Sequence, residues 1–263
     1  MAVPSQVLAP RSTIRFRPPR FGLGGSHLGD SDEQTAIATV DAAYQAGIRF
    51  FDTSPAYGDS EQRLGAALQR RPRGEYLLSI RTLGEDPEAE VRKSSERLGL
   101  AVDLVLAEDP AAYPAAYPAL DQLKRDGVIK AVGAVADDWQ QLDHLVRDVE
   151  LDCVLLTGHY SLLDQQAKPL LDRCVARGVS AVVAGALVLQ AETVQERRIA
   201  AVCERHGVSL PQAALAFPSR HQAVTSVLIA AASPAEIRAD AALVRQPVPE
   251  RLWKDPELIR LLS

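Results

Sequence analysis

The chain alternates between short apolar runs and longer segments in which apolar positions recur every three or four residues. Runs such as Asp152–Thr157 are apolar through their centre, which is typical of strands that are covered on both faces. In the longer segments the apolar residues share one helical face, as Ile37, Val40 and Tyr44 do, and a glycine follows, here Gly47. The pattern therefore predicts parallel strands that are separated by amphipathic helices.

Strand–helix units follow one another along the chain. We expect strands at residues 21–25, 48–52, 76–81, 102–107, 128–135, 152–157, 179–184 and 224–230. We expect helices at residues 31–46, 60–69, 87–98, 114–126, 139–149, 163–177, 191–206, 209–217, 233–244 and 249–262. Units of this number and size predict an α/β fold, a (β/α)8 TIM barrel with a C-terminal helix.

A single barrel domain spanning residues 21–263 is expected, because no break in composition marks a linker. Residues 1–20 are polar and proline-rich, and we expect a loose arm or a short hairpin there. A doubly wound open sheet is the competing fold. It is less favoured because no strand is followed by a Gly-x-Gly-x-x-Gly pattern that opens a helix, and the glycine-rich run at residues 22–25 lacks this spacing.

Composition narrows the possible partners and environment. The chain has 263 residues, of which 47% are hydrophobic and 24% charged, and this is enough to bury a large core. The net charge of −5 argues against nucleic acid or an anionic membrane as partner. No apolar run approaches the roughly 20 residues of a membrane span, and no hydrophobic signal core is present, so we expect a cytoplasmic protein. The three widely spaced cysteines predict reduced core thiols.

A carboxylate and a phenol stand together after the second predicted strand. Asp52 lies where this strand ends, and Tyr57 lies on the loop just beyond it. Ser60 and Glu61 then predict a helix start, Ser60 as the N-cap and Glu61 as a negative charge in the first turn. Because a β/α barrel places its chemistry at the carboxyl ends of its strands, Asp52 and Tyr57 are candidate catalytic residues.

Several stretches along the chain match one known pattern. Residues 51–58 read Phe-Asp-Thr-Ser-Pro-Ala-Tyr-Gly, and Ser-Glu and Leu-Gly follow at residues 60–61 and 64–65. Further matches lie at residues 95–100, 102–106, 123–133, 160–165 and 208–238. Together these stretches resemble the aldo-keto reductase family, and most closely its L-fucose and aldose dehydrogenase-like branch.

The resemblance implies a catalytic tetrad of Asp, Tyr, Lys and His. In that tetrad the tyrosine protonates a substrate carbonyl as hydride arrives from NADPH. Asp52 and Tyr57 match the first two positions, whereas Arg81 stands at the lysine position and Glu108 at the histidine position. The steroid double-bond reductases of the family also carry glutamate at the histidine position, so Glu108 alone does not exclude redox chemistry.

The two replacements change the expected electrostatics of the site. Arginine stays cationic and favours planar pairing with carboxylates, so we expect Arg81 to pair with Asp52 or Glu108. Two acids in one barrel mouth cannot easily both ionise, so we expect one of them to hold a proton at neutral pH.

The stretch after the last strand departs from the cofactor-binding pattern that the resemblance implies. In the family a glycine and a basic residue precede Ser-Pro there, and Ala230 and Ala232 replace them here. The loop after residue 184 is shorter than the family's, and the chain contains no asparagine to hold a nicotinamide carboxamide. Ser233, at the start of the last barrel helix, and Arg238, which matches a family arginine, are the candidate cofactor-binding residues.

Three further residues after predicted strands are candidates for substrate binding. They are His27, His159 and Tyr160, and His159 is the best candidate for a substrate-facing base. No metal site is predicted, because the acids and histidines of the barrel mouth lack the local spacing of metal ligands.

The replacements favour an enzyme that works without a redox cofactor. In this hypothesis Tyr57, with Asp52, Arg81 and Glu108, performs acid–base chemistry on a small carbonyl-bearing or polyol-like substrate, as dehydration, isomerisation or cyclisation requires. The first alternative is an NADP-dependent oxidoreductase that reduces a carbonyl or an enone. The second is a catalytically inactive binding subunit, against which the intact pair of Asp52 and Tyr57 counts. The oligomeric state is left open.

Overall fold

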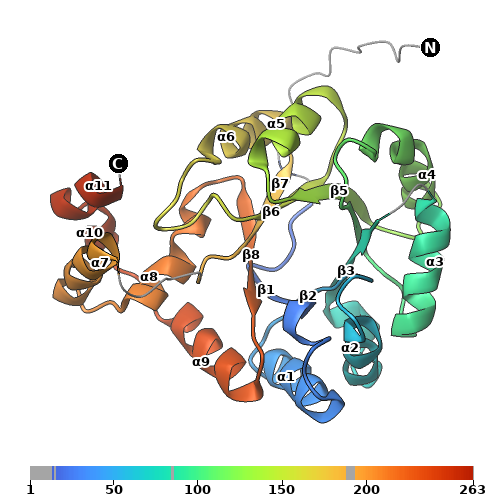
Figure 1. The fold of residues 1–263 in the computed structure, drawn as a ribbon, viewed down its shortest axis with the longest axis horizontal. Helices are drawn as coiled ribbons and strands as arrows, with labels where there is room; N and C mark the ends of the chain where they lie inside the picture. Colours follow the sequence, from blue (N-terminus) through green and yellow to red (C-terminus); the bar gives the residue numbers. More distant parts are fainter. Residues whose placement is uncertain (1–13, 15, 84–85, 188–192, 263) are drawn as a thin grey trace.

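Parallel strands close into a barrel in the computed structural model of this chain, which describes residues 14, 16–83, 86–187 and 193–262. Each strand pairs with its neighbours in chain order, and β1 also pairs with β8 (Figure 1). The strands are β1 (Phe21–Gly24), β2 (Phe50–Asp52), β3 (Leu77–Thr82), β4 (Leu104–Ala107), β5 (Ala131–Ala136), β6 (Cys153–Thr157), β7 (Ser180–Ala184) and β8 (Val224–Ala230). The predicted (β/α)8 TIM barrel is confirmed.

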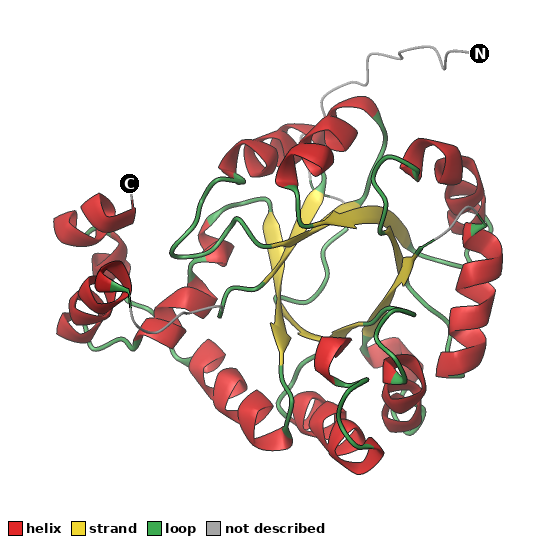
Figure 2. Ribbon diagram, viewed as in Figure 1, coloured by secondary structure: helices red, strands yellow, loops and turns green. Residues whose placement is uncertain are grey.

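Helices surround the barrel, as Figure 2 shows. They are α1 (Glu33–Gln45), α2 (Ser60–Leu68), α3 (Pro87–Leu98), α4 (Tyr113–Arg125), α5 (Trp139–Asp148), α6 (Lys168–Arg177), α7 (Val194–Arg205), α8 (Leu210–Ala216), α9 (Pro234–Arg245), α10 (Glu250–Trp253) and α11 (Pro256–Leu262). Short 3-10 helices occur at η1 (Gly25–His27), η2 (Arg73–Glu75) and η3 (Pro218–Arg220). None of the described helices is long and apolar enough to cross a membrane.

Local sequence signals set several helix ends where they were expected. The side chain of Asp32 accepts a hydrogen bond from the backbone N–H of Thr35 (2.9 Å) and caps the start of α1. Gly99 and Gly178 end α3 and α6 with φ values of 62° and 68°, a left-handed conformation that glycine adopts without strain.

Two helices begin differently from the sequence prediction. α6 starts at Lys168, later than predicted, because Ser161 and Asp164 close a turn before it, with 2.6 Å between the Ser161 N and Asp164 O atoms. Ser60 is the first residue of α2 rather than its N-cap. Its hydroxyl donates to the carbonyl oxygen of Gly25 (3.0 Å) and so links the start of α2 to η1, which follows β1.

The two ends of the chain also depart from the prediction. The C-terminal helix is divided into α10 and α11, because the Asp255 side chain accepts a hydrogen bond from the backbone N–H of Glu257 (2.8 Å) and starts a new helix. α11 packs against α7, beside the barrel (Figure 1). Most of the N-terminal arm, including most of the predicted hairpin, lies outside the described residues, and residues 16–20 form neither helix nor strand.

Hydrophobic side chains fill the barrel itself. Phe50, Leu106, Leu155 and Val182 belong to one buried cluster contributed by alternating positions of several strands. Phe16, from the segment before β1, packs against this cluster. A larger cluster joins the outer faces of the strands to the surrounding helices. The barrel is therefore a packed core, and a ligand can enter only at its ends.

The register of the strands brings candidate residues to one edge. Gly24 is opposite both Asp52 on β2 and Ala230 on β8, and Asp52 is opposite Ser79 on β3. Because all the strands run in the same direction, the loops that follow them meet above this edge.

Candidate active site

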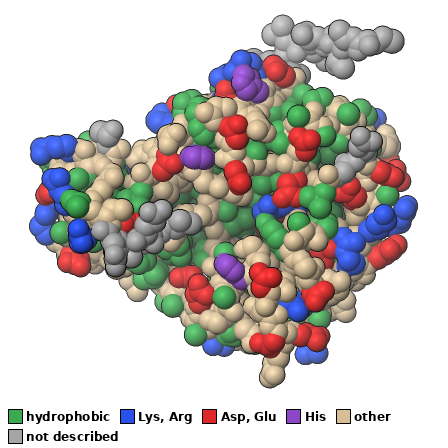
Figure 3. All heavy atoms as spheres, viewed as in Figure 1, with side chains coloured by type: hydrophobic (Ala, Val, Ile, Leu, Met, Phe, Trp, Pro, Cys, Tyr) green, Lys and Arg blue, Asp and Glu red, His purple; other side chains and the backbone are tan. Residues whose placement is uncertain are grey.

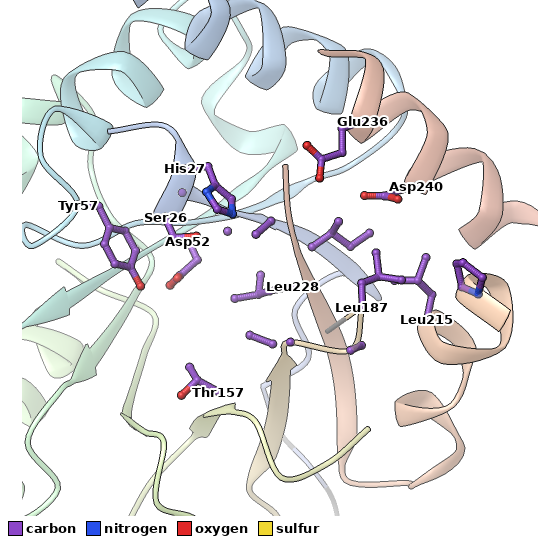
Figure 4. A pocket seen from close by; sticks show the side chains of 18 of the residues that line it. Ser26, His27, Asp52, Tyr57, Thr157, Leu187, Leu215, Leu228, Glu236 and Asp240 are labelled. Carbon is purple, nitrogen blue, oxygen red and sulfur yellow. The ribbon is translucent and has the colours of Figure 1, made fainter. Parts of the chain in front are cut away.

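A cavity of about 570 Å³ opens at the carboxyl ends of the strands (Figure 3, Figure 4). Figure 3 shows a hollow near the centre of this face, with hydrophobic side chains in it and acidic side chains around it. Leu187, Leu215 and Leu228 form an apolar side of the cavity, and Asp52 and Tyr57 lie on another side (Figure 4). Its volume is in the range of sites that hold small molecules or cofactors.

Asp52 is the last residue of β2 and is 1% exposed. The Ser79 hydroxyl donates to Asp52 Oδ1 (2.6 Å), and Arg81 Nη2 donates to Oδ2 (3.3 Å). Burial raises the pKa of the Asp52 carboxyl, although Arg81 and Ser79 oppose the shift. Two donors on two oxygens hold this carboxyl group in one orientation.

Arg81 lies between the two acids of the barrel mouth. Its Nη1 atom is 3.4 Å from Glu108 Oε1, so the expected pairing occurs with both Asp52 and Glu108. Burial lowers the pKa of Arg81, but its interactions with Asp52, Tyr57 and Glu108 outweigh this effect, so the pKa is raised overall. The cavity wall includes Arg81 and Asp52 but not Glu108, whose Oε2 atom is buried without a hydrogen-bond partner.

The expectation that one acid holds a proton stays a prediction, and the repulsion between two acids on which it was based is not what the structure shows. A guanidinium group separates the two carboxylates, so their mutual repulsion is relieved. What raises the pKa of Asp52 is burial rather than the charge of Glu108.

Tyr57 is held in the cavity wall by a tight turn. Its backbone N–H donates to the Ser54 carbonyl (3.0 Å), the Ser60 N–H donates to the Tyr57 carbonyl (3.0 Å), and Gly58 takes a φ of 54°. The Arg81 guanidinium lies over the phenol ring, 5.1 Å from its centroid. Burial raises the pKa of the Tyr57 phenol, and the Arg81 cation opposes this shift. The structure thus places a neutral phenol beside a fixed cation.

The three candidate substrate-binding residues occupy two adjoining cavities. His27, in η1, is exposed and lines the cavity that contains Tyr57. His159 and Tyr160 line a second cavity of about 450 Å³, and Thr157 lines both. His159 has a φ of 55°, and its Nδ1 atom lies 3.0 Å from a carboxylate oxygen of Asp164. Tyr160 is 5% exposed and packs against other aromatic rings.

The two candidate cofactor-binding residues lie at the start of α9. The Ser233 hydroxyl is the N-cap and accepts a hydrogen bond from the backbone N–H of Glu236 (3.2 Å). Arg238 is exposed on the same helix. Neither residue belongs to the cavity wall, although Ala230, the alanine at the family's glycine position, does.

Two acids of α9 line the cavity instead. Glu236 and Asp240 are four residues apart and share one helical face, and Figure 4 shows them across the cavity from Tyr57. Glu236 Oε2 accepts a hydrogen bond from the backbone N–H of Ala232 (2.8 Å). Asp240 Oδ2 is buried without a hydrogen-bond partner. Burial, followed by the charge of Glu236, raises the pKa of Asp240.

The loops after β6 and β7 complete the site. Gly185–Leu187 lines the cavity, with a φ of 80° at Gly185, and residues 188–192 lie outside the described residues. The Thr157 hydroxyl, at the end of β6, donates to the carboxylate of Asp137 from the loop after β5. Across the parts of the chain that the structure describes, no group of three or more His, Cys, Asp or Glu side chains could hold a metal ion.

Sequence reasoning missed three polar residues of this site. Ser79 precedes Arg81 by two residues on a strand, and this spacing places both side chains on the face that also carries Asp52. Glu236 and Asp240 have the four-residue spacing of one helical face. Both spacings are visible in the sequence, but the sequence does not show which face meets the cavity.

The chain belongs to the aldo/keto reductase family, whose sequence profile matches residues 20–255. A D-threo-aldose 1-dehydrogenase from Pseudomonas sp. is 31% identical over 312 aligned positions, which cover 93% of this chain and 94% of the relative. A pyridoxal 4-dehydrogenase from Microbacterium luteolum is 28% identical, with 89% of this chain and 91% of the relative covered. The family expected from the sequence motifs is thereby confirmed.

Solved structures show the same fold. The holo form of the aldo-keto reductase AKR11C1 from Bacillus halodurans superposes with a TM-score of 0.80, at 21% identity, over 97% of this chain and 96% of that chain.

Proposed function

We propose that this protein is an oxidoreductase that uses a nicotinamide dinucleotide to interconvert a hydroxyl and a carbonyl group on a small substrate. One observation carries the proposal. The Tyr57 phenol stands in the wall of a ligand-sized cavity, and Arg81, paired with the buried Asp52, lies against its ring. The relatives described above are named an aldose and a pyridoxal dehydrogenase, so aldoses and small aldehydes are the first substrates to test.

The preference for redox-independent chemistry without a cofactor, drawn from the sequence, is not supported. The family and the names of the relatives favour the oxidoreductase alternative. The replacement of lysine by Arg81 also carries less weight than the sequence suggested, because Arg81 still provides a cation beside Tyr57.

Two features of the cavity support binding of a nicotinamide dinucleotide. The cavity reaches from Tyr57 to α9, and its leucine side chains offer apolar surface to flat rings (Figure 4). The buried Oδ2 atom of Asp240 lacks a hydrogen-bond donor, which a ribose hydroxyl would supply. Bound there, a nicotinamide dinucleotide would supply the hydride in reduction and accept it in oxidation.

In the proposed mechanism Tyr57 is the catalytic acid and base. During reduction its phenol gives a proton to the carbonyl oxygen while the carbonyl carbon receives a hydride, and during oxidation the phenolate takes the proton of the substrate hydroxyl. The Arg81 cation opposes the rise in the pKa of Tyr57 and so stabilises the phenolate that forms. Asp52 acts through Arg81, whose Nη2 donates to it, and Ser79 acts through Asp52, because its hydroxyl holds that carboxyl group in place.

The substitution Tyr57→Phe tests whether Tyr57 is the catalytic acid and base. The variant removes only the hydroxyl, and we expect kcat for an aldose or aldehyde substrate to fall by about 10²- to 10⁴-fold. The Kd for NADH or NADPH should stay close to that of the wild type. Tyr117→Phe, which removes a hydroxyl on α4 away from this cavity, is the matched control and should leave turnover unchanged.

Two results would contradict the proposal. One is wild-type turnover by Tyr57→Phe, which would remove Tyr57 from the chemistry. The other is the absence of binding of either dinucleotide to the wild-type protein, followed by thermal shift and by nucleotide fluorescence.

A further inference from the structure

We propose that the α9 end of the cavity selects NAD(H) over NADP(H), with Glu236 and Asp240 as the residues that discriminate. This inference rests on the proposed function, because it requires a nicotinamide ring beside Tyr57. It adds a specificity that the family membership and the relatives' names do not give to this chain.

The lining of the cavity runs from Tyr57 to α9, and the proposal places the adenosine half of a dinucleotide at the α9 end. With the nicotinamide at Tyr57, the rest of the molecule has to follow the cavity along β8 to α8 and α9, where Leu228, Leu215 and the two acids lie. Figure 4 shows Glu236 and Asp240 on the side of the cavity far from Tyr57. The ribose that carries or lacks a 2′-phosphate is therefore the part closest to these acids.

Among the described residues, the lining of this end of the cavity contains no cation for a phosphate group. Arg81 is the only arginine or lysine among the described residues that line the cavity, and it is already paired with Asp52 and Glu108. Arg238 is exposed on α9 outside the cavity wall. A 2′-phosphate carries about −1.5 to −2 charges at neutral pH and depends on such partners.

The protein's own carboxylates occupy the positions that a phosphate would need. Glu236 Oε2 accepts the backbone N–H of Ala232 at 2.8 Å, so an anion from the protein already fills the position at the start of α9. A phosphate would have to displace this carboxylate or lie against it. The charge of a 2′-phosphate would also meet that of Asp240 one turn further along the helix.

A ribose with free hydroxyls suits the same two residues. Asp240 Oδ2 is a buried acceptor without a donor, and a ribose hydroxyl is a donor of the right kind. In the unrelated Rossmann fold, an acidic side chain bonds the adenosine ribose of NAD, whereas an arginine accommodates the phosphate of NADP, and the same chemistry applies to the two acids here. The acids therefore attract one cofactor and repel the other.

The experiment compares the Kd values for NADH and NADPH by fluorescence titration of the wild type and of Asp240→Asn, Glu236→Gln and the double variant. Each substitution removes the charge, keeps one acceptor oxygen and replaces the other oxygen by an NH2 donor. Glu88→Gln is the matched control, since Glu88 is also an exposed glutamate in a first helical turn, that of α3, away from the cavity. Thermal unfolding of each variant checks that it folds.

We expect the wild type to bind NADH at least about tenfold more tightly than NADPH, because of repulsion at close range. The double variant should lose most of this preference, mainly through tighter NADPH binding, and the control should keep it. Higher salt should also reduce the preference, because it screens the repulsion.

The proposed selectivity is wrong if the wild type binds NADPH as tightly as NADH or more tightly. It is also wrong if the ratio of the two Kd values is unchanged in both single variants and in the double variant. Either result would leave the oxidoreductase function standing. Failure of both cofactors to bind would overturn the function as well.

Discussion

Replacing Arg81→Met tests how the protein keeps a carboxyl group buried at the base of its candidate site. Methionine has a similar length and no charge. Asp52 is 1% exposed, and its Oδ2 atom lies 3.3 Å from Arg81 Nη2. The variant leaves Asp52 with Ser79 as its hydrogen-bond donor and without a neighbouring cation.

The structure sets the size of the effect. At 3.3 Å and an effective dielectric constant of about 20, the attraction between the two charges is about 5 kcal/mol. Removing one partner of a buried ion pair typically destabilises a protein by about 3 to 5 kcal/mol. Asp52 can escape part of this penalty by taking up a proton. At pH 7 protonating the Asp52 carboxylate costs about 4 kcal/mol, because each pH unit above its ordinary pKa of 3.8 adds about 1.4 kcal/mol.

The sign of the pH dependence follows from the direction of the pKa shift. The pKa of Asp52 is raised in the folded protein, so its stabilising contribution is complete below the unfolded pKa and is lost as pH rises through the folded one. Arg81→Met raises the folded pKa further. We therefore expect a loss of about 3 to 4 kcal/mol at pH 7 and of only about 2 kcal/mol at pH 5.

Urea unfolding followed by circular dichroism at pH 5 and pH 7 measures both losses. Arg125→Met is the matched control, because Arg125 forms an exposed ion pair with Asp121 and should contribute less than about 1 kcal/mol. Adding Asp52→Asn to Arg81→Met should recover most of the stability at pH 7. The reasoning is refuted if Arg81→Met costs no more than the control, or if its loss is independent of pH and of Asp52.

Two further predictions concern packing and pH. A Cβ atom at Gly65 in α2 would lie 2.1 Å from the carbonyl oxygen of Leu98, so Gly65→Ala should destabilise the protein by about 1 to 3 kcal/mol in denaturant unfolding. Gly74→Ala, with no atom within 4 Å, should change stability by less than about 0.5 kcal/mol, and equal effects would contradict the close approach of α2 to α3. Burial raises the pKa of Tyr57 above its ordinary value of 10.0, so kcat for oxidation should rise about tenfold per unit between about pH 6 and pH 9, while kcat for reduction stays level. A level oxidation profile, with the chemical step shown to be rate-limiting, would argue against the phenolate as base.

The sequence by itself determined the architecture and one half of the site. The alternation of apolar strands and amphipathic helices predicts a barrel. The sequence suffices for this prediction because each pattern is formed by residues that are neighbours along the chain. Helix ends at Gly99 and Gly178 were predictable for the same local reason. Asp52 and Tyr57 lie five residues apart at the end of one strand, so their shared place at the barrel mouth also follows from the sequence.

The sequence predicted that Arg81 pairs with Asp52 or Glu108, and only the tertiary structure decided that it pairs with both. The register between β2 and β3 sets Ser79 opposite Asp52 and brings Arg81 between Asp52 and Glu108, so the two acids share a cation. Asp255, whose local hydrogen bond starts α11, also pairs with Arg205 at the end of α7 and with His206, and the sequence did not predict these contacts.

The sequence also could not predict which residues form the wall of the cavity opposite Tyr57. Glu236 and Asp240 follow Tyr57 by nearly the whole chain, and only the closure of β8 onto β1 brings α9 to the cavity that Tyr57 lines. The sequence shows two acids on one helical face. Whether they face solvent or a ligand depends on how that helix packs on the barrel, which no local pattern encodes.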